Sequence, residues 1–156
     1  MNKIVLIISF FVLTLSCTKE KEFNEARKEQ VKIEVRQMLD NYFKSIRSKG
    51  LTAEYEYLDQ SSQFFWVPPG FNSPISFDSV KTILDGNAEL MKSVDFRWDT
   101  LYILPLSENI ANYTGIISGK IVSQQDSVSL VKMIETGTVI KDKNRWKILN
   151  GQSRNL

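Results

Sequence analysis

Residues 110–123, IANYTGIISGKIVS, alternate between two kinds of side chain. From Tyr113 to Ile121 every second residue is apolar or a glycine, namely Gly115 and Gly119, and the residues between them are mostly polar. This alternation is typical of a β-strand that buries one face. Glycines on an otherwise packed face allow sharp bending or the close approach of another element. The stretch therefore predicts a strand that is bent or closely approached on its buried side.

Three more strands are expected at residues 94–104, 128–141 and 145–152. The segments that separate these strands are short enough for hairpins, so consecutive strands should pair antiparallel. Residues 128–141 are apolar on both parities, which is typical of a strand covered on both faces. Helices could cover one face, while the other face either binds a second subunit or belongs to a simple two-layer core.

Helices are expected before these strands. Residues 24–49 repeat apolar side chains at intervals of three and four, which predicts a long amphipathic helix that ends at Gly50. A short helix over residues 52–59, a strand over 63–67 and a third helix that begins at Ser76 or Asp78 should follow. Three helices and a four-stranded meander indicate one α+β domain over residues 24–156.

The composition excludes several kinds of site. The 156 residues include no histidine and one cysteine, which excludes Ser-His-Asp triads, histidine-ligated metals and an intrachain disulfide. The 20 basic residues nearly balance the 18 acidic ones, so we expect no nucleic-acid partner. The sequence has neither calcium-loop spacing nor a glycine-rich phosphate loop, and we expect no metal and no cofactor.

The first residues have the features of a secretory signal. Lys3 precedes an apolar run, residues 4–15, that is too short to cross a bilayer. The only cysteine, Cys17, follows after the small residue Ser16, and the junction resembles the lipobox of bacterial lipoproteins. That resemblance implies that residues 1–16 are removed, that Cys17 is lipidated, and that residues 17–23 tether the domain to a membrane. A core cysteine and an uncleaved N-terminal anchor are the two alternatives.

A lipid anchor would place the protein in the bacterial cell envelope. The residues after Cys17, Lys19-Glu20-Lys21-Glu22, alternate in charge. Some surface-exposed lipoproteins carry an acidic cluster there instead. We therefore expect an outer-membrane anchor with the domain facing the periplasm, while surface exposure stays open.

The order of the elements, with a strand between the second and third helices, resembles the nuclear transport factor 2-like superfamily, which includes SnoaL-like proteins. The local similarity is best at residues 40–43 (DNYF), 76–78 (SFD) and 143–148 (KNRWKI). The resemblance implies a cone-like fold, in which a strongly curved, mainly antiparallel sheet wraps around three N-terminal helices. It also implies a ligand pocket between sheet and helices, and an outer sheet face that often forms a homodimer.

Related enzymes move protons with carboxylates, tyrosines or histidines in this pocket. Strict alternation would place Asn150 and Gln152 on the same face of the last strand as Trp146 and Ile148. In many family members a His-x-His pair stands at the positions of Asn150 and Gln152. An amide cannot exchange a proton near neutral pH, so the pocket should stay polar there and lose acid–base function. Alternatively, both amides only satisfy backbone groups near the C-terminus.

Two carboxylates are the candidate acids. Asp99 shares a strand face with Asp95 and Arg97, and such a charged stripe is usually solvated. Glu135 lies on an apolar parity and is the best candidate for a buried acid, although an outward position beside Lys132 or Lys141 is the commoner arrangement. The aromatic residues expected near the cavity are Tyr42, Tyr55, Tyr57, Trp66, Trp98 and Tyr102.

The sequence thus favours a lipid-anchored domain that binds a small apolar or amphiphilic ligand, or a partner protein, without catalysis. One alternative is a SnoaL-like isomerase, dehydratase or cyclase that uses Glu135 or Asp99 together with a tyrosine. Another is a dimeric interaction module that binds itself or a second envelope protein.

Overall fold

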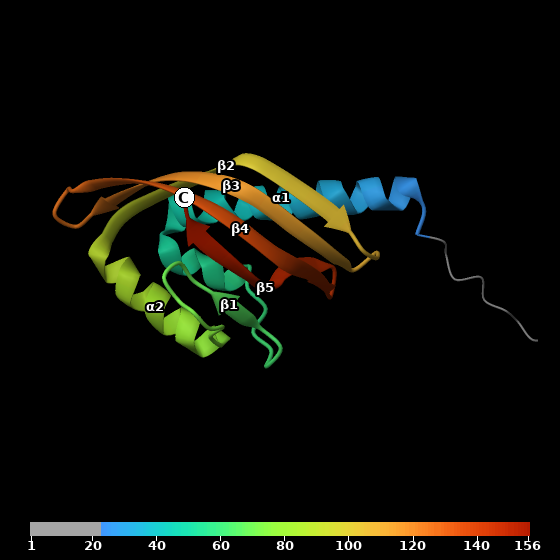
Figure 1. Cartoon of the computed structure of the whole chain (residues 1–156), viewed down its shortest axis with the longest axis horizontal. Helices are drawn as coiled ribbons and strands as arrows, with labels where there is room; N and C mark the ends of the chain where they lie inside the picture. The colour runs from blue at the N-terminus through green and yellow to red at the C-terminus, as the bar shows by residue number, and fades with distance from the viewer. Residues whose placement is uncertain (1–22) are drawn as a thin grey trace, which may run out of the picture.

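Helix α1 (Glu25–Lys49) lies against one face of a five-stranded sheet in the computed structural model, which describes residues 23–156 (Figure 1). The elements that follow α1 are the 3-10 helix η1 (Leu51–Glu56), strand β1 (Phe65–Val67), helix α2 (Phe77–Leu90) and strands β2 (Met91–Pro105), β3 (Ile110–Ser123), β4 (Val128–Asp142) and β5 (Arg145–Asn155). The predicted signal peptide, Cys17 and nearly all of the predicted tether lie outside the described residues. Among the residues described, no helix is long and apolar enough to cross a membrane.

The sheet has the strand order β1-β5-β4-β3-β2. Strands β2 to β5 form the predicted antiparallel meander, and β1 joins its edge by pairing parallel to β5. In Figure 1 the strands curve over α1, and the sheet does not close into a barrel. The predicted α+β fold, with a curved and mainly antiparallel sheet around the helices, is confirmed. One element differs, since the second helical segment is a 3-10 helix that already ends at Glu56.

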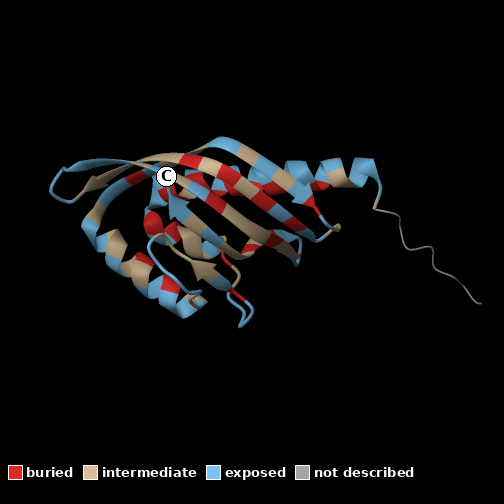
Figure 2. Cartoon of the chain, viewed as in Figure 1, coloured by how far each residue is buried: buried red, intermediate tan, exposed pale blue. Residues whose placement is uncertain are grey.

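The core lies between α1 and the inner face of the sheet. The buried stripe of α1 consists of the apolar residues that the sequence spacing predicts: Val31, Val35, Met38, Leu39, Tyr42, Phe43 and Ile46. Buried strand residues such as Ile117, Val139 and Ile148 belong to the same core cluster. Figure 2 shows buried positions on both α1 and the strands. Burying one aliphatic side chain of this size contributes about 1.5–3 kcal/mol. Hydrophobic burial therefore fixes which face of the sheet lies toward the helices.

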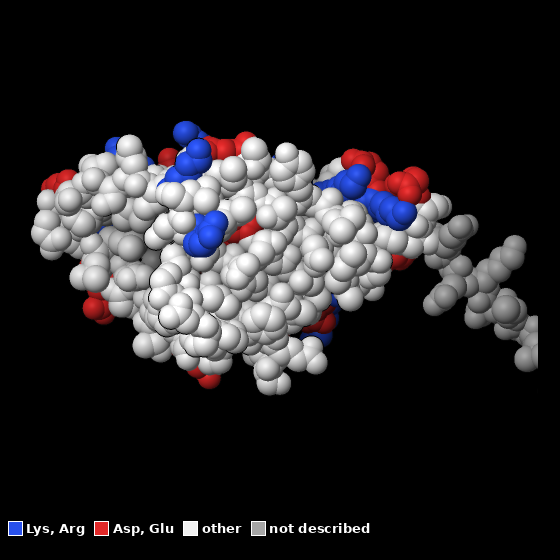
Figure 3. Space-filling model, in the orientation of Figure 1, with Lys and Arg blue, Asp and Glu red and all other residues white. Residues whose placement is uncertain are grey.

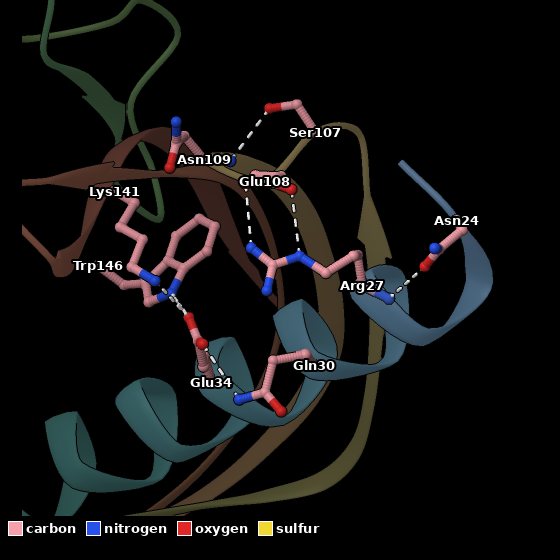
Figure 4. A network of polar contacts seen from close by, with 9 residues as sticks. All are labelled: Asn24, Arg27, Gln30, Glu34, Ser107, Glu108, Asn109, Lys141 and Trp146. Carbon is pink, nitrogen blue, oxygen red and sulfur yellow. Dashed lines mark hydrogen bonds and ion pairs between the residues drawn. The ribbon is translucent and has the colours of Figure 1, made fainter. Parts of the chain in front are cut away.

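Polar contacts hold the first half of α1 against the turn between β2 and β3 and against the adjoining ends of β4 and β5 (Figure 4). Glu34 accepts hydrogen bonds from Lys141 Nζ at 2.7 Å and from Trp146 Nε1 at 2.9 Å. These two donors lower the pKa of Glu34 to about 2. Arg27, one turn after the Asn24 N-cap, forms an ion pair with Glu108 at 3.0 Å. The start of the domain is thereby fixed to the sheet.

A β-bulge in β5 changes which side chains face the helices. Val139 pairs with Ile148 but Thr138 pairs with Asn150, so one extra residue, Leu149, is inserted in β5. An extra residue of this kind redirects the side chains that follow it. The predicted alternation is therefore wrong beyond Ile148: Asn150 and Gln152 lie with Thr138 on the outer face.

Candidate functional site

A cavity of about 180 Å³ lies between the helices and the inner face of the sheet. Most of its wall is apolar, and five aromatic rings contribute to it: those of Tyr42, Phe43, Phe64, Trp66 and Phe96. Its polar wall residues are Tyr42, Glu54, Asn87, Glu135 and Ser153. An apolar cavity of roughly 150 Å³ can hold a benzene-sized molecule. The site therefore has room for a ligand about the size of one six-membered ring.

The first of two acidic groups in the wall is Glu135 of β4, which is only 7% exposed. The hydroxyl of Tyr113, on the neighbouring strand β3, donates a hydrogen bond to Glu135 Oε1 at 2.9 Å. Burial raises the pKa of Glu135 to about 8, and the hydrogen bond from Tyr113 opposes that rise. Of the two positions that the sequence leaves open for this residue, the structure shows the inward one: Glu135 lines the cavity and does not lie in solvent beside Lys132 or Lys141.

The second acidic group is Glu54 of η1. Its carboxyl group reaches the same cavity, where the Tyr42 hydroxyl of α1 forms a hydrogen bond with it. Burial raises the pKa of Glu54 to about 7, against the lowering effect of that hydrogen bond. Burial also raises the pKa values of Tyr42 and Tyr113 well above the ordinary value, so both hydroxyls keep their protons at neutral pH.

The two carboxyl groups act on each other. A negative charge on Glu54 raises the pKa of Glu135, because like charges in a poorly solvated site repel. None of the described residues that line the cavity is a lysine or an arginine, so neither acid has a cation there. Groups that titrate close to neutral pH can accept or donate a proton, or become the counter-charge of a cation.

Of the aromatic residues expected near the cavity, Tyr42 and Trp66 lie on its wall. Tyr55 and Tyr57 instead line a separate polar groove, and the Tyr55 hydroxyl lies 2.5 Å from Asp85 Oδ1. Trp98 stacks on Phe43 with a ring-centroid distance of 4.9 Å. It does not line the cavity.

Four other predicted site residues lie away from the cavity. Tyr102 is 69% exposed, and Asn150 and Gln152 line a shallow depression on the outer sheet face. Asp99 is exposed and accepts a hydrogen bond from Ser118 at 2.5 Å. The hypothesis that Asp99 is the pocket acid is therefore wrong, because its strand face is solvated.

Sequence reasoning missed Glu54 and Tyr113 as members of the site. Glu54 lies in a short segment whose polar residues carry no periodic signal. Tyr113 lies on the apolar parity of its strand, where it looks like a core residue, and only the strand register brings it beside Glu135. The signal that could have found this pair is the hairpin register: aligning residues 110–123 with 128–142 as a hairpin places Tyr113 diagonally opposite Glu135 on the inner face. No group of three or more potential metal ligands is found among residues 23–156.

Comparison by sequence gives no family: no protein-family model matches the chain, and no curated protein matches it. Solved structures do match. A nuclear transport factor 2-like superfamily protein from Salmonella enterica superposes with a TM-score of 0.70 at 14% identity, covering 81% of this chain and 92% of that one. The chain has the nuclear transport factor 2-like fold.

Two other structures show the range of proteins with this nuclear transport factor 2-like fold. The hexachlorocyclohexane dehydrochlorinase LinA-type3 from Novosphingobium barchaimii has a TM-score of 0.66 at 10% identity, with 85% of this chain and 90% of that chain covered. The association domain of C. elegans CaMKII has a TM-score of 0.65 at 13% identity, with coverages of 83% and 98%. At these identities the likeness concerns the fold alone.

Proposed function

We propose that this chain is a lipid-anchored protein of the bacterial cell envelope whose domain binds a small, largely apolar molecule in the cavity. The observation that carries the proposal is the buried Glu135 carboxyl, held by Tyr113 at the wall of an otherwise apolar cavity. Small-molecule sites commonly combine an apolar wall with a few fixed polar groups that orient the ligand. Glu135 and Glu54 are those groups, and the Cys17 lipid supplies the membrane attachment.

Ligand binding is tested on the full chain, purified in detergent. Trp66 lines the cavity, whereas Trp146 donates its indole N–H to Glu34 outside it. When single-ring compounds, both neutral and charged, are added one at a time, the NMR signal of the Trp66 indole N–H should shift and that of Trp146 should not. Native mass spectrometry should also detect a co-purified small molecule. If no compound shifts the Trp66 signal and no molecule co-purifies, the proposal fails.

Proton-transfer catalysis is the second candidate, and the paired carboxyls favour it. The amides Asn150 and Gln152 argue against acid–base function, whereas Glu135 and Glu54 supply the cavity with a pair of titratable groups. In an isomerisation or dehydration, one carboxyl of the Glu54–Glu135 pair, in its carboxylate form, would take a proton from the bound molecule, while the other, still protonated, donates one. A dehydrochlorinase with the same fold gives this candidate a structural parallel.

Catalysis has its own test. An enzyme of this kind would exchange a C–H hydrogen of its bound molecule with solvent, which NMR detects as deuterium incorporation in D₂O. Glu135→Gln should abolish this exchange, while Asp99→Asn, on the exposed face, should leave it unchanged. Equal exchange by the wild type and by Glu135→Gln would contradict a catalytic role of Glu135.

A homodimer through the outer sheet face is the proposed assembly. Two neighbouring rows across the sheet contain no charged residue: Leu104, Asn112, Thr138 and Asn150, then Tyr102, Thr114, Thr136 and Gln152. In Figure 3 the surface over β3, β4 and β5 accordingly shows few charged side chains. A second copy would cover the exposed apolar groups of this face, among them Leu104.

A further inference from the structure

The charge of the cavity wall restricts which ligand fits it. The titratable groups that face the cavity are Glu54 from η1, Glu135 from β4 and Tyr42 from α1. The other elements contribute uncharged residues to the wall, including Asn87 of α2, Trp66 of β1, Phe96 of β2, Ile117 of β3 and Ser153 of β5. A wall with two acids and no cation favours a positively charged guest.

Glu135 lacks one hydrogen bond. Its Oε1 atom accepts from Tyr113, whereas its Oε2 atom accepts no hydrogen bond from residues 23–156. The side chain is more than nine-tenths buried and lines the cavity, and Oε2 is not among the fully enclosed polar atoms without a partner, so a molecule in the cavity can reach it. Buried carboxylate oxygens are normally hydrogen-bonded, and an N–H donor with a positive charge makes the strongest such bond.

The aromatic wall suits the same guest. The rings of Phe43, Phe64, Trp66 and Phe96 surround the space that the acids face. An ammonium group is attracted to the faces of aromatic rings, and an apolar ring or chain attached to it gains from contact with their carbon atoms. The two acids therefore fit the charged end of such a molecule, and the aromatic rings fit its apolar end.

We propose that the ligand is a small hydrophobic amine, bound as its ammonium form with N–H donors directed at Glu135 Oε2 and at Glu54. Its apolar part, about the size of one six-membered ring, fills the space among the aromatic side chains. This inference rests on the proposed function, because both require a molecule in the same cavity.

The proposal fixes the direction of the pH dependence. In the empty cavity Glu54 and Glu135 hold protons up to about pH 7 and 8. A bound ammonium favours the carboxylate forms, so its binding releases protons and strengthens as pH rises. The increase is at most about tenfold per pH unit for each proton released. An alkyl amine stays charged over this range, since its pKa is about 10.4.

Calorimetry on the full chain in detergent tests the proposal with two probes of equal shape, cyclohexylamine and cyclohexanol, after subtraction of an empty-micelle titration. From pH 6 to pH 8 the affinity for cyclohexylamine should increase by about tenfold or more, with proton release seen in buffers of different ionisation enthalpy. Cyclohexanol should bind more weakly and should show no such increase. This comparison needs no variant and therefore does not depend on how a mutant folds.

Two isosteric variants test whether the affinity for cyclohexylamine arises in the cavity. Glu135→Gln should lower the affinity for cyclohexylamine at pH 8 by about tenfold or more. Asp99→Asn, on the exposed strand face, should leave this affinity unchanged. Equal affinity of wild type and Glu135→Gln would overturn the proposal. If cyclohexanol binds as tightly as the amine at pH 8, the ammonium proposal fails and the small-molecule cavity stands. If neither probe nor any other single-ring compound binds, both proposals fail.

Discussion

The hydroxyl oxygen of Tyr113 lies 2.9 Å from Oε1 of Glu135 and joins two buried side chains of neighbouring strands. The contact is diagonal, since Tyr113 is paired with Gly137 and Glu135 with Gly115. A Cβ atom on Gly137 would lie 2.9 Å from Cε1 of the Tyr113 ring. The tyrosine can therefore lie across this glycine, and it holds the Glu135 carboxyl at the wall of the cavity.

Removal of the Tyr113 hydroxyl should raise the pKa of Glu135. The hydrogen bond stabilises the charged carboxylate, so Tyr113→Phe takes away a group that lowers the pKa. Titration of the glutamate carboxyl carbons by NMR should place the midpoint of Glu135 above its wild-type value of about 8. Tyr102→Phe, at an exposed tyrosine, is the matched control and should change nothing. An unchanged or lower midpoint in Tyr113→Phe would show that the hydroxyl does not stabilise the carboxylate.

The cavity acids should make the protein less stable as pH rises. In the unfolded chain Glu135 has its ordinary pKa of 4.5, while the folded chain holds that proton up to about pH 8. The folded state therefore binds more protons between these values, and the free energy of unfolding falls by up to about 1.4 kcal/mol per pH unit. Urea unfolding at pH 5 to 8 should show this loss.

Glu135→Gln should reduce that slope, because an amide does not titrate. Glu34 provides a contrast, since its pKa is lowered to about 2. Its contribution to the free energy of unfolding is therefore lost only as pH falls below 4.5. Glu34→Gln should therefore leave the slope between pH 5 and pH 8 intact. A wild-type stability that is flat or rises over this range would contradict the burial of Glu135 and Glu54 as acids.

Two glycine substitutions should have opposite effects. At Gly137 an added Cβ would lie 2.5 Å from the Asn150 carbonyl oxygen as well as against Tyr113, so Gly137→Ala should lower the stability by about 1–3 kcal/mol. At Gly86, within α2, a Cβ would meet no atom within 4 Å. Gly86→Ala should therefore raise the stability by about 0.5–1 kcal/mol. Thermal and urea unfolding measure both effects, and a neutral Gly137→Ala would argue against the close approach of Tyr113.

The sequence predicts the fold better than the site, for physical reasons. The helical stripe of α1 and the alternation in β3 arise from burial and recur along each element, so one sequence suffices to find them. The bulge at Leu149 is a single inserted residue without a pattern, and it moved Asn150 and Gln152 to the outer face. Glu54 joins Glu135 at the cavity only through the packing of η1 against α1 and α2, which local sequence does not encode.

Lipidation of Cys17 should determine where the protein is found in the cell. Two or three acyl chains at the N-terminus hold a protein stably at a membrane, because each buried CH₂ contributes about 0.8 kcal/mol. Cys17→Ala should abolish incorporation of labelled fatty acid and release the protein from the membrane fraction. Ser16→Ala, which keeps a small residue before the cysteine, should retain both properties. Membrane retention of unlabelled Cys17→Ala would instead support an uncleaved N-terminal anchor.

A charge on the outer sheet face should break the proposed homodimer. Leu104 pairs with Asn112 on the outer face and is 61% exposed, so a second copy would bury it. Analytical ultracentrifugation of the full chain in detergent should give a dimer that Leu104→Glu converts to a monomer, since the row of Leu104, Asn112, Thr138 and Asn150 holds no cation and an unpaired carboxylate at an apolar interface is costly. Ile33→Glu, at an exposed isoleucine of α1, should leave the dimer intact. A wild-type monomer at high concentration, or a dimer that only Ile33→Glu disrupts, would place the contact elsewhere.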